Sequence, residues 1–397
     1  MDEPFEKLFV NLKFWLVGLS PDALQPWVSI LLSIVPLLAG FPLLFAITTI
    51  IERKALGRIQ NRLGPNRVGP YGFLQPIADG LKILTKEDVV PHTADKFVHF
   101  ISPIVLVVPS FLALSTLPYG KYMTALDVEA GLLLFFAAGA SSEVAIFMAG
   151  WSSRNKYSML GAMRAIAQMV SYELPLILAA ITVVMAVGSL RPIEIVAAQA
   201  HYHSGLPSWH LFTPWGLAGF ILFMIAATAE SNRTPFDIPE GESEIIAGYL
   251  VEYSGFKFAL FFLGEYLGLF AVSCLGITLF LGGWTAPVEF MQWVPSYVWF
   301  VSKLCVLLGF FIWLRGTLPR LRMDQLMGFA WKFMVPLTLI NILVVALWQF
   351  TRAWDFGGAT ICRWLLCGAL IVIPYAALGR GLTRARRITA RVYRFAD

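Results

Sequence analysis

Nine apolar stretches alternate with polar or charged segments along the chain. They cover residues 27–51, 97–117, 128–150, 161–188, 214–231, 259–283, 297–316, 331–350 and 362–379. An α-helix needs about 20 mostly apolar residues to cross the hydrocarbon core of a bilayer. The fifth stretch is the shortest and ends in charged residues. The pattern therefore predicts an all-α, polytopic membrane helical bundle of about nine transmembrane helices.

Two further segments have apolar residues at helical spacing but are too short to span a bilayer. The first begins the chain and contains Phe5, Leu8, Phe9, Leu12 and Trp15. The second has Phe73, Ile77, Leu81 and Leu84 on one helical face and Asp79, Lys82 and Lys86 on another. Both patterns are typical of amphipathic helices at a membrane interface. We expect an N-terminal amphipathic segment (1–26), a bundle of eight spans (27–350), and an extra C-terminal span with a basic tail (351–397).

The composition agrees with a membrane protein. Of 397 residues, 58% are hydrophobic and only 14% are charged, with a mean hydropathy of +0.70. Soluble chains carry about 25% charged residues, so a soluble enzyme or a nucleic-acid-binding protein is disfavoured. The four cysteines lie in apolar runs without a CxxC pair, which argues against an iron–sulfur or zinc site. We expect this chain to bind no metal and no cofactor.

The distribution of Lys and Arg predicts the orientation of the bundle. If the N-terminus is outside, the inner segments contain 23 of these residues and the outer segments contain 6, with Lys303 inside a span. Positive residues concentrate in cytoplasmic loops. The N-terminus is therefore expected to be periplasmic and the C-terminus cytoplasmic, in a bacterial cell inner membrane.

Several spans contain charged residues, which are costly at membrane depth and often functional. They are Glu143, Arg164, Glu173, Glu230, Glu265 and Lys303. Static pairing between helices is one interpretation. A connected, water-containing chain of titratable groups is the other, and charges on five helices favour it. Tyr266 directly follows Glu265, so a phenol is expected near that acid.

An acidic segment follows the fifth span, on the side where the other loops are basic. It contains Glu230, Asp237, Glu240, Glu242, Glu244 and Glu252 against Arg233 alone, a net charge of −5. Crowding of carboxylates raises some of their pKa values, so the segment could exchange protons near neutral pH. The alternatives are a solvated acidic loop and a surface that only docks a partner.

The loops carry motifs that resemble a known family. They are ERKALGRIQNRLGPNRVGPYGFLQPIADGLKILTKE, GWSSRNKYSMLGAMRAIAQMVSYELP, AESNRTPFDIPEGESEIIAGYLVEYSG, FFLGEY and LPRLRMDQLM. Together they resemble the H subunit of the proton-pumping NADH–quinone oxidoreductase, respiratory complex I, whose mitochondrial counterpart is subunit 1. The match runs in order from about residue 27 to 350. The ninth span is less typical of the family, and Glu143 is not recognised from its pattern.

The resemblance implies a membrane subunit of an enzyme that couples quinone reduction to proton transport. Quinone is then the substrate, either ubiquinone or menaquinone, while NADH oxidation, flavin mononucleotide and the iron–sulfur clusters belong to partner subunits. The implied partners are the quinone-site subunits of the peripheral arm and other membrane-arm subunits. The residues that match the quinone tunnel and its coupling loops are Glu52, Arg53, Arg62, Asp79, Arg233, Asp237 and Arg315.

A second set of residues matches the acidic pathway towards the pumps. It comprises Glu173, Glu230, Glu240, Glu242, Glu244, Glu252 and Glu265, to which the pattern of charges within spans adds Tyr266 and Lys303. The tunnel is expected to open between the first span, the 73–84 amphipathic helix and the sixth span, where a long isoprenoid tail can enter from lipid.

Three other functions compete with this interpretation. The first is the homologous subunit of a membrane-bound hydrogenase or of a ferredoxin- or F420-dependent complex. The quinone-type first loop and the GWSSRNKYS segment favour the NADH–quinone enzyme over it. The second is an autonomous transporter, which is expected to show internal repeats that this chain lacks. The third is a structural anchor, which does not need charges on five helices.

Overall fold

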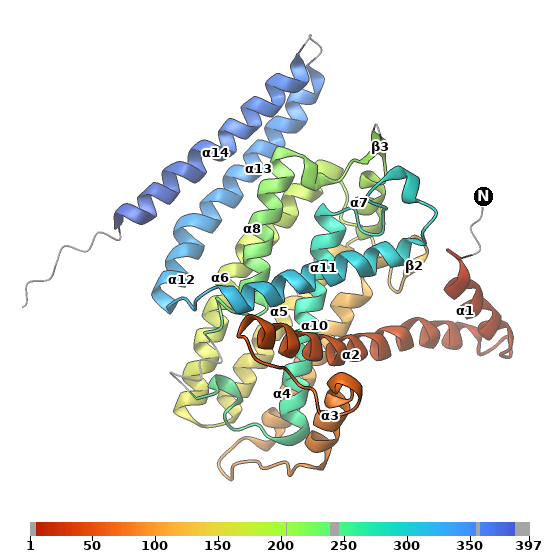
Figure 1. Cartoon of the computed structure of the whole chain (residues 1–397), viewed down its shortest axis with the longest axis vertical. Coiled ribbons are helices and arrows are strands. Elements are labelled where there is room, and N and C mark those ends of the chain that lie inside the picture. The colour runs from red at the N-terminus through yellow and green to blue at the C-terminus, as the bar shows by residue number, and fades with distance from the viewer. Residues whose placement is uncertain (1–4, 204, 239–245, 355–357, 386–397) are drawn as a thin grey trace, which may run out of the picture.

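The computed structural model describes residues 5–203, 205–238, 246–354 and 358–385, and within them it is a bundle of helices (Figure 1). Eight helical segments there are long and apolar enough to cross a membrane, which confirms the predicted polytopic fold. They are α2 (Gln25–Ile59), α4 (Lys96–Ser115), α5 (Gly131–Ser152), α6 (Lys156–Val187), α10 (Gly255–Phe280), α11 (Ser296–Thr317), Met323–Ala353 and α14 (Ala359–Ala385).

The shorter elements connect or extend the long helices, and those between residues 323 and 353 together make up the Met323–Ala353 segment. The helices are α1 (Leu8–Gly18), α3 (Gln75–Thr85), α7 (Pro192–Gln199), α8 (Pro214–Glu230), α12 (Met323–Phe329) and α13 (Val335–Phe350), with a π-helical turn η5 (Ala330–Met334) between the last two. The 3₁₀ turns are η1 (Pro70–Gly72), η2 (His210–Phe212), η3 (Gly248–Leu250), η4 (Glu289–Met291) and η6 (Thr351–Ala353). Strands β1 (Pro118–Gly120) and β2 (Met123–Thr124) form one antiparallel pair, and β3 (Tyr202–His203) and β4 (Leu206–Pro207) form another.

The fifth predicted span is α8, which has 17 residues. It begins with Pro214 after Thr213, whose hydroxyl accepts a hydrogen bond from the Gly216 amide, as is favourable at a helix N-terminus. Its length of about 26 Å is at the lower limit for crossing a bilayer. Most of its side chains are buried, because it packs against α6 and α10.

Helix α2 extends beyond the boundary expected from hydropathy. The sequence places the end of this span at residue 51, but the helix continues through Glu52 and Arg53 to Ile59. Its 35 residues are about 52 Å long, more than the thickness of the hydrocarbon core. Glu52, the first charged residue of this extension, is buried among partners that neutralise it.

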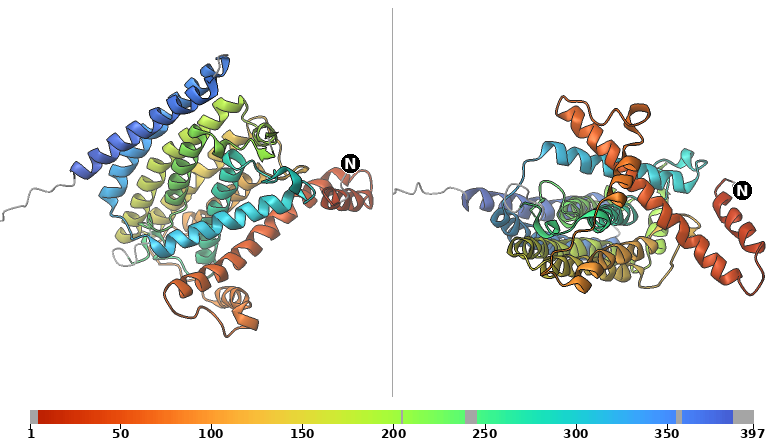
Figure 2. Two further views of the ribbon diagram at one scale, coloured as in Figure 1. Left: turned by 45° about the horizontal axis from the view of Figure 1, so that its top comes forward. Right: turned by 90° about the horizontal axis from the view of Figure 1, so that it is seen from below.

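Helix α10 is the centre of the bundle. In its apolar 18-residue stretch 61% of the residues are buried, whereas in the corresponding stretch of α2 only 6% are buried. It contacts α4, α8 and α11, and it also contacts α2 and α3. Helices α2 and α11 cross the more upright helices and lie side by side, whereas α13 and α14 form a pair at one edge (Figures 1 and 2). The sixth span is therefore the element that brings the functional residues together.

The loop after α2 contains a tight turn at its glycines. Gly69 and Gly72 have φ values of 70° and 77°, which favour glycine. A Cβ atom at Gly72 would collide with the carbonyl oxygen of Pro65. The predicted amphipathic helix follows as α3, which packs against α2 and α10. Its apolar residues Ile77 and Leu81 are about 60% exposed, as expected for a helix that faces lipid at the interface.

Candidate functional site

Glu52 is the centre of a buried ionic network between three helices. The residue is only 5% exposed, and its Oε1 atom pairs with Arg315 from α11 and, at 3.3 Å, with Arg233 from the loop after α8. Tyr266 of α10 donates its hydroxyl hydrogen to Glu52 Oε2 at 2.6 Å. The carboxylate thus satisfies two cations and a phenol at once, in a region where an isolated charge would be very unfavourable.

Arg233 lies between this network and the next acid along α10. Its guanidinium is 4.1 Å from the centre of the Tyr266 ring, within the range of a cation–π interaction. Burial alone would lower the pKa of Arg233, but Tyr266 and the carboxylates of Glu52 and Glu265 together raise that pKa above its ordinary value. Arg233 therefore stays charged and responds to both Glu52 and Glu265.

The next residue of α2, Arg53, points to a different side of the helix. Arg53 forms an ion pair of 2.7 Å with Asp79 of α3, whose other oxygen accepts a hydrogen bond from Gln75 at 2.9 Å. Arg53 also lines a cleft of about 660 Å³ together with Arg62 and Arg67. This cleft is lined by three cations and is suited to an anionic or strongly polar group. Glu52 and Arg53 thus connect the interior of the bundle with the cleft beside α3.

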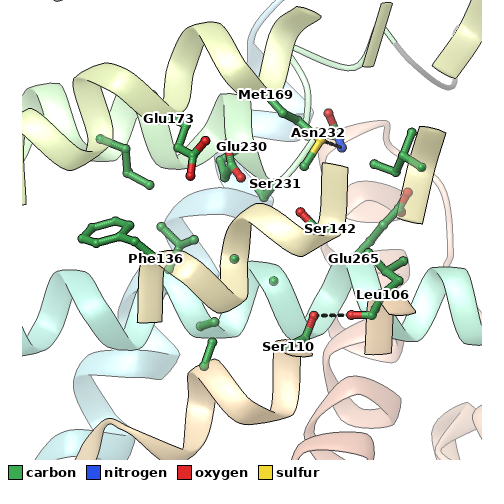
Figure 3. A pocket seen from close by; sticks show the side chains of 18 of the residues that line it. Leu106, Ser110, Phe136, Ser142, Met169, Glu173, Glu230, Ser231, Asn232 and Glu265 are labelled. Atoms are coloured by element: carbon green, nitrogen blue, oxygen red, sulfur yellow. Dashed lines mark hydrogen bonds between the residues drawn. The ribbon is translucent and has the colours of Figure 1, made fainter. Parts of the chain in front are cut away.

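A second group of carboxyls surrounds a small cavity next to the ionic network. Glu173 from α6, Glu230 from α8 and Glu265 from α10 all line it, and Figure 3 shows the carboxyl groups of Glu173 and Glu230 close together. The cavity has a volume of about 80 Å³, enough for several water molecules. Tyr249 of η3 donates its hydroxyl hydrogen to Glu265 Oε1 at 2.6 Å. The lining of this cavity is mainly apolar, and Tyr249 and the three acids, which come from three different helices, are its ionisable groups.

The two groups are joined by the chain segment 231–238, which follows α8 and carries Arg233 and Asp237. Gln168 of α6 holds this segment, because its amide nitrogen donates to the carbonyl oxygens of Ala229 and Phe236 at 2.8 Å and to Asn232 Oδ1 at 3.1 Å. The loop after α11 contributes as well, since the Leu321 amide donates to the Pro235 carbonyl at 3.1 Å. Asp237 is half-buried within this held segment.

Two predicted members of the acidic path lie elsewhere in the fold. Lys303 of α11 lies at the other end of α10, where its ammonium donates to the carbonyl oxygens of Leu281, Gly283 and Thr285 at 2.6–2.8 Å. Its position follows from the chain order, because Lys303 lies in the first half of α11, which begins soon after the end of α10 and crosses that helix (Figure 1). Glu252 accepts a hydrogen bond of 2.7 Å from Asn155, the residue before α6, and does not line the cavity. Glu240, Glu242 and Glu244 lie outside the described residues.

The structure adds residues that the sequence did not single out. Tyr249 and Gln168 make the hydrogen bonds that position Glu265 and the 231–238 segment. Gln168 carried a detectable signal, because a fully buried amide in an apolar span requires partners. Tyr249 carried none, since it follows an acidic loop with no helical pattern. Among the described residues, no group of three or more His, Cys, Asp or Glu is placed to hold a metal ion.

Known proteins resemble this chain over most of its length. The family model described as NADH dehydrogenase matches residues 32–346. The H subunit of NADH-quinone oxidoreductase from Geobacillus kaustophilus is 48% identical over 306 residues, which cover 77% of this chain and 88% of the relative. This chain belongs to the family of NADH-quinone oxidoreductase H subunits. It is accordingly a multi-pass membrane subunit of an oxidoreductase complex.

Other members of the H-subunit family cover similar lengths. The H subunit of Dehalococcoides mccartyi strain CBDB1 is 48% identical over 321 residues, covering 81% of this chain and 87% of the relative. That of Polaromonas naphthalenivorans is 43% identical over 342 residues, covering 84% and 94%. The family model ends at residue 346, before α14, which begins at Ala359.

Proposed function

We propose that this subunit forms the membrane part of a quinone-access tunnel and begins the proton path that quinone reduction drives. The observation that carries the proposal is the contact between the two groups of residues on α10. Tyr266 binds the Glu52 network, while the preceding Glu265 lines the acidic cavity with Glu173 and Glu230. A change of charge in one group therefore changes the protonation equilibria of the other, because charges interact strongly where water is scarce.

In this proposal the quinone enters from lipid between α2, α3 and α10. These three helices pack against one another, and the apolar face of α3 is exposed. The isoprenoid tail follows this face, and the polar headgroup passes the cations of the cleft, Arg53 and Arg62. Partner subunits of the peripheral arm complete the site, hold the flavin and the iron–sulfur clusters, and deliver electrons to the quinone.

The coupling step is electrostatic. Reduction of a quinone takes up protons or leaves transient negative charge near the inner end of α2. Arg233 and Tyr266 lie between that region and Glu265, so their response changes the protonation of Glu265 and then of Glu230 and Glu173. Protons continue towards other membrane-arm subunits. The acidic loop with Glu240, Glu242 and Glu244 contributes to the same response. The alternative is that this loop only docks the peripheral arm.

The proposal includes a bacterial inner-membrane location with the N-terminus in the periplasm and the C-terminus in the cytoplasm. The excess of Lys and Arg in the segments on one side supports this orientation. The cleft of Arg53, Arg62 and Arg67 then faces the cytoplasm, where the peripheral arm supplies electrons.

The test is the Glu230→Gln variant in a complex shown to be fully assembled and reconstituted into vesicles. We expect both quinone reduction and proton pumping to fall, because the cavity loses a group that can bind and release a proton. The matched control is Glu289→Gln, which changes an exposed acid outside the bundle interior. Wild-type rates of both processes in the assembled Glu230→Gln complex would show that the cavity is not a proton path.

A further inference from the structure

Glu143 of α5 has no role in the family pattern, but the fold places it beside the acidic cavity. Its carboxyl is in hydrogen-bond contact with that of Glu173 on the neighbouring α6, and it also acts electrostatically on Glu230. The Oε1 atom of Glu143 is buried and has no hydrogen-bond partner among the described residues. A third carboxyl thus joins Glu173 and Glu230 at membrane depth.

Contact between two carboxyl groups sets a condition on their protons. An ionised carboxylate has only acceptor atoms, so two ionised groups cannot form a hydrogen bond with each other. Their repulsion would also be large away from water. The pair of Glu143 and Glu173 therefore holds at least one proton between its two members in this geometry.

The surroundings of the pair connect it to the cavity. Glu173 lines the cavity, which has room for several water molecules, and Glu230 points one buried oxygen without a described partner into the same region. The charged groups that face the pair are thus Glu230 from α8 and, across the cavity, Glu265 from α10. A static link between α5 and α6 would need only a hydrogen bond, which an amide at position 143 could supply equally well.

We propose that Glu143 is a further proton-carrying residue of the acidic path and that it shares one proton with Glu173. A proton that reaches Glu173 from the cavity converts the pair to its doubly protonated form. Glu143, which is only half-buried, then releases a proton to a water molecule on the α5 side, which restores the singly protonated pair. No bond other than O–H forms or breaks, and no electron moves. The inference rests on the proposed function of Glu173 in the proton path.

The experiment compares Glu143→Gln and Glu143→Asp in the complete, assembled complex in vesicles. Infrared difference spectra recorded on quinone reduction report the C=O stretch of protonated carboxyls. We expect Glu143→Gln to remove or shift one such band and to lower proton pumping several-fold. We expect Glu143→Asp, which keeps the carboxyl, to retain a shifted band and to restore part of the pumping. The control is Glu129→Gln, an exposed acid just before α5, which leaves both readouts unchanged.

The outcomes separate this inference from the function on which it rests. If Glu173→Gln pumps at the wild-type rate, the proposed proton path itself fails. If Glu173→Gln is impaired but Glu143→Gln keeps the wild-type infrared band and pumping rate, Glu143 is only structural and the inference is overturned. Pumping by Glu143→Gln equal to that of Glu143→Asp also overturns it. Should Glu143→Gln fail to assemble, an unshifted band in Glu143→Asp is the result that overturns it.

Discussion

Glu265 and Tyr266 are consecutive residues of α10, but their side chains belong to two different groups of interactions. Glu265 accepts a hydrogen bond from Tyr249 and lines the acidic cavity, whereas Tyr266 donates to Glu52 in the ionic network. Neighbouring residues of a helix point about 100° apart, so one turn of α10 reaches both groups. The coupling between quinone chemistry and proton movement proposed above depends on this juxtaposition.

Replacing Glu52 with Gln is expected to destabilise the subunit strongly. The substitution leaves Arg233 and Arg315 close together without their anion, and breaking a buried ion pair costs roughly 3–5 kcal/mol. The measurement is the thermal stability of the assembled complex in mild detergent, together with quinone reduction. The control is Asp127→Asn, which breaks an exposed ion pair with Arg191 and is expected to have little effect. Equal stability of the two variants would contradict the importance of the Glu52 network.

Replacing Arg62 with Ala is expected to impair quinone reduction selectively. Arg62 lines the cleft beside α3, and loss of one charge-assisted hydrogen bond to a headgroup or a partner's loop lowers kcat/KM about tenfold. Reduction of a hydrophilic electron acceptor by the NADH-oxidising arm should be unchanged, because that reaction does not use the membrane subunit. The control is Arg352→Ala, which changes an exposed arginine that is expected on the opposite side of the membrane. Unchanged quinone reduction in an assembled Arg62→Ala complex would make the tunnel assignment wrong.

His210, in the turn before α8, predicts a local sensitivity to acid. Burial lowers the pKa of His210 from 6.5 to about 4, so the folded turn favours the neutral ring. As pH falls below about 6.5 the unfolded turn binds a proton that the folded turn excludes, and stability is lost progressively until the pH approaches the folded-state pKa. Between about pH 7 and about pH 5 the loss is on the order of 2 kcal/mol.

Hydrogen exchange in the assembled complex measures this effect in the segment 208–216. We expect exchange there to be faster at the lower pH than the intrinsic rate change explains. His210→Phe should remove the excess, since a phenyl ring keeps the packing against Trp215, whose ring centre is 5.2 Å away, but cannot be protonated. His201→Phe, at an exposed position, should keep it. An excess that persists in His210→Phe would assign the sensitivity to another group.

The orientation of the bundle can be tested by cysteine labelling in intact cells. The background is Cys305→Ser with Cys362→Ser, because these two native cysteines are exposed while Cys274 and Cys367 are buried. A membrane-impermeant maleimide should not reach Val68→Cys until the cells are permeabilised. It should label Lys121→Cys directly, because the 116–130 segment is expected outside. Labelling of position 68 from outside would reverse the topology.

Hydropathy alone predicted the helical bundle, because a bilayer requires long apolar helices with internally satisfied backbones. It also identified Glu173, Glu230 and Glu265, since charges at membrane depth are rare. It failed for α2, where Glu52 ended the predicted span but lies inside the helix. The reason is that Arg233 and Arg315, about 180 and 260 residues away in sequence, neutralise Glu52. Such long-range pairing leaves no local pattern.

The same limit explains Lys303 and Gln168. An ammonium within a span was expected to join the acidic residues, because only its depth was visible in the sequence. Its partners are instead backbone carbonyls after α10, which carry no sequence signal. Gln168 could have been singled out as an amide within an apolar span, but its partners could not, because its three hydrogen bonds are made mostly to the backbone of a distant segment. Side-chain identity therefore indicates which residues need partners, but tertiary packing decides which partners they find.

The contacts of Lys303 have a mechanical consequence for the central helix. Three carbonyl oxygens at or just beyond the end of α10 are held by one ammonium, which also lies 4.2 Å from the centre of the Trp209 ring. Sliding α10 along its axis by even one residue, about 1.5 Å, would stretch these contacts beyond hydrogen-bonding range. Helix α10 is thus anchored at its C-terminal end. Motion at Glu265 and Tyr266 is then restricted to side-chain rearrangement, small rotation and bending, and a piston-like stroke of α10 is disfavoured.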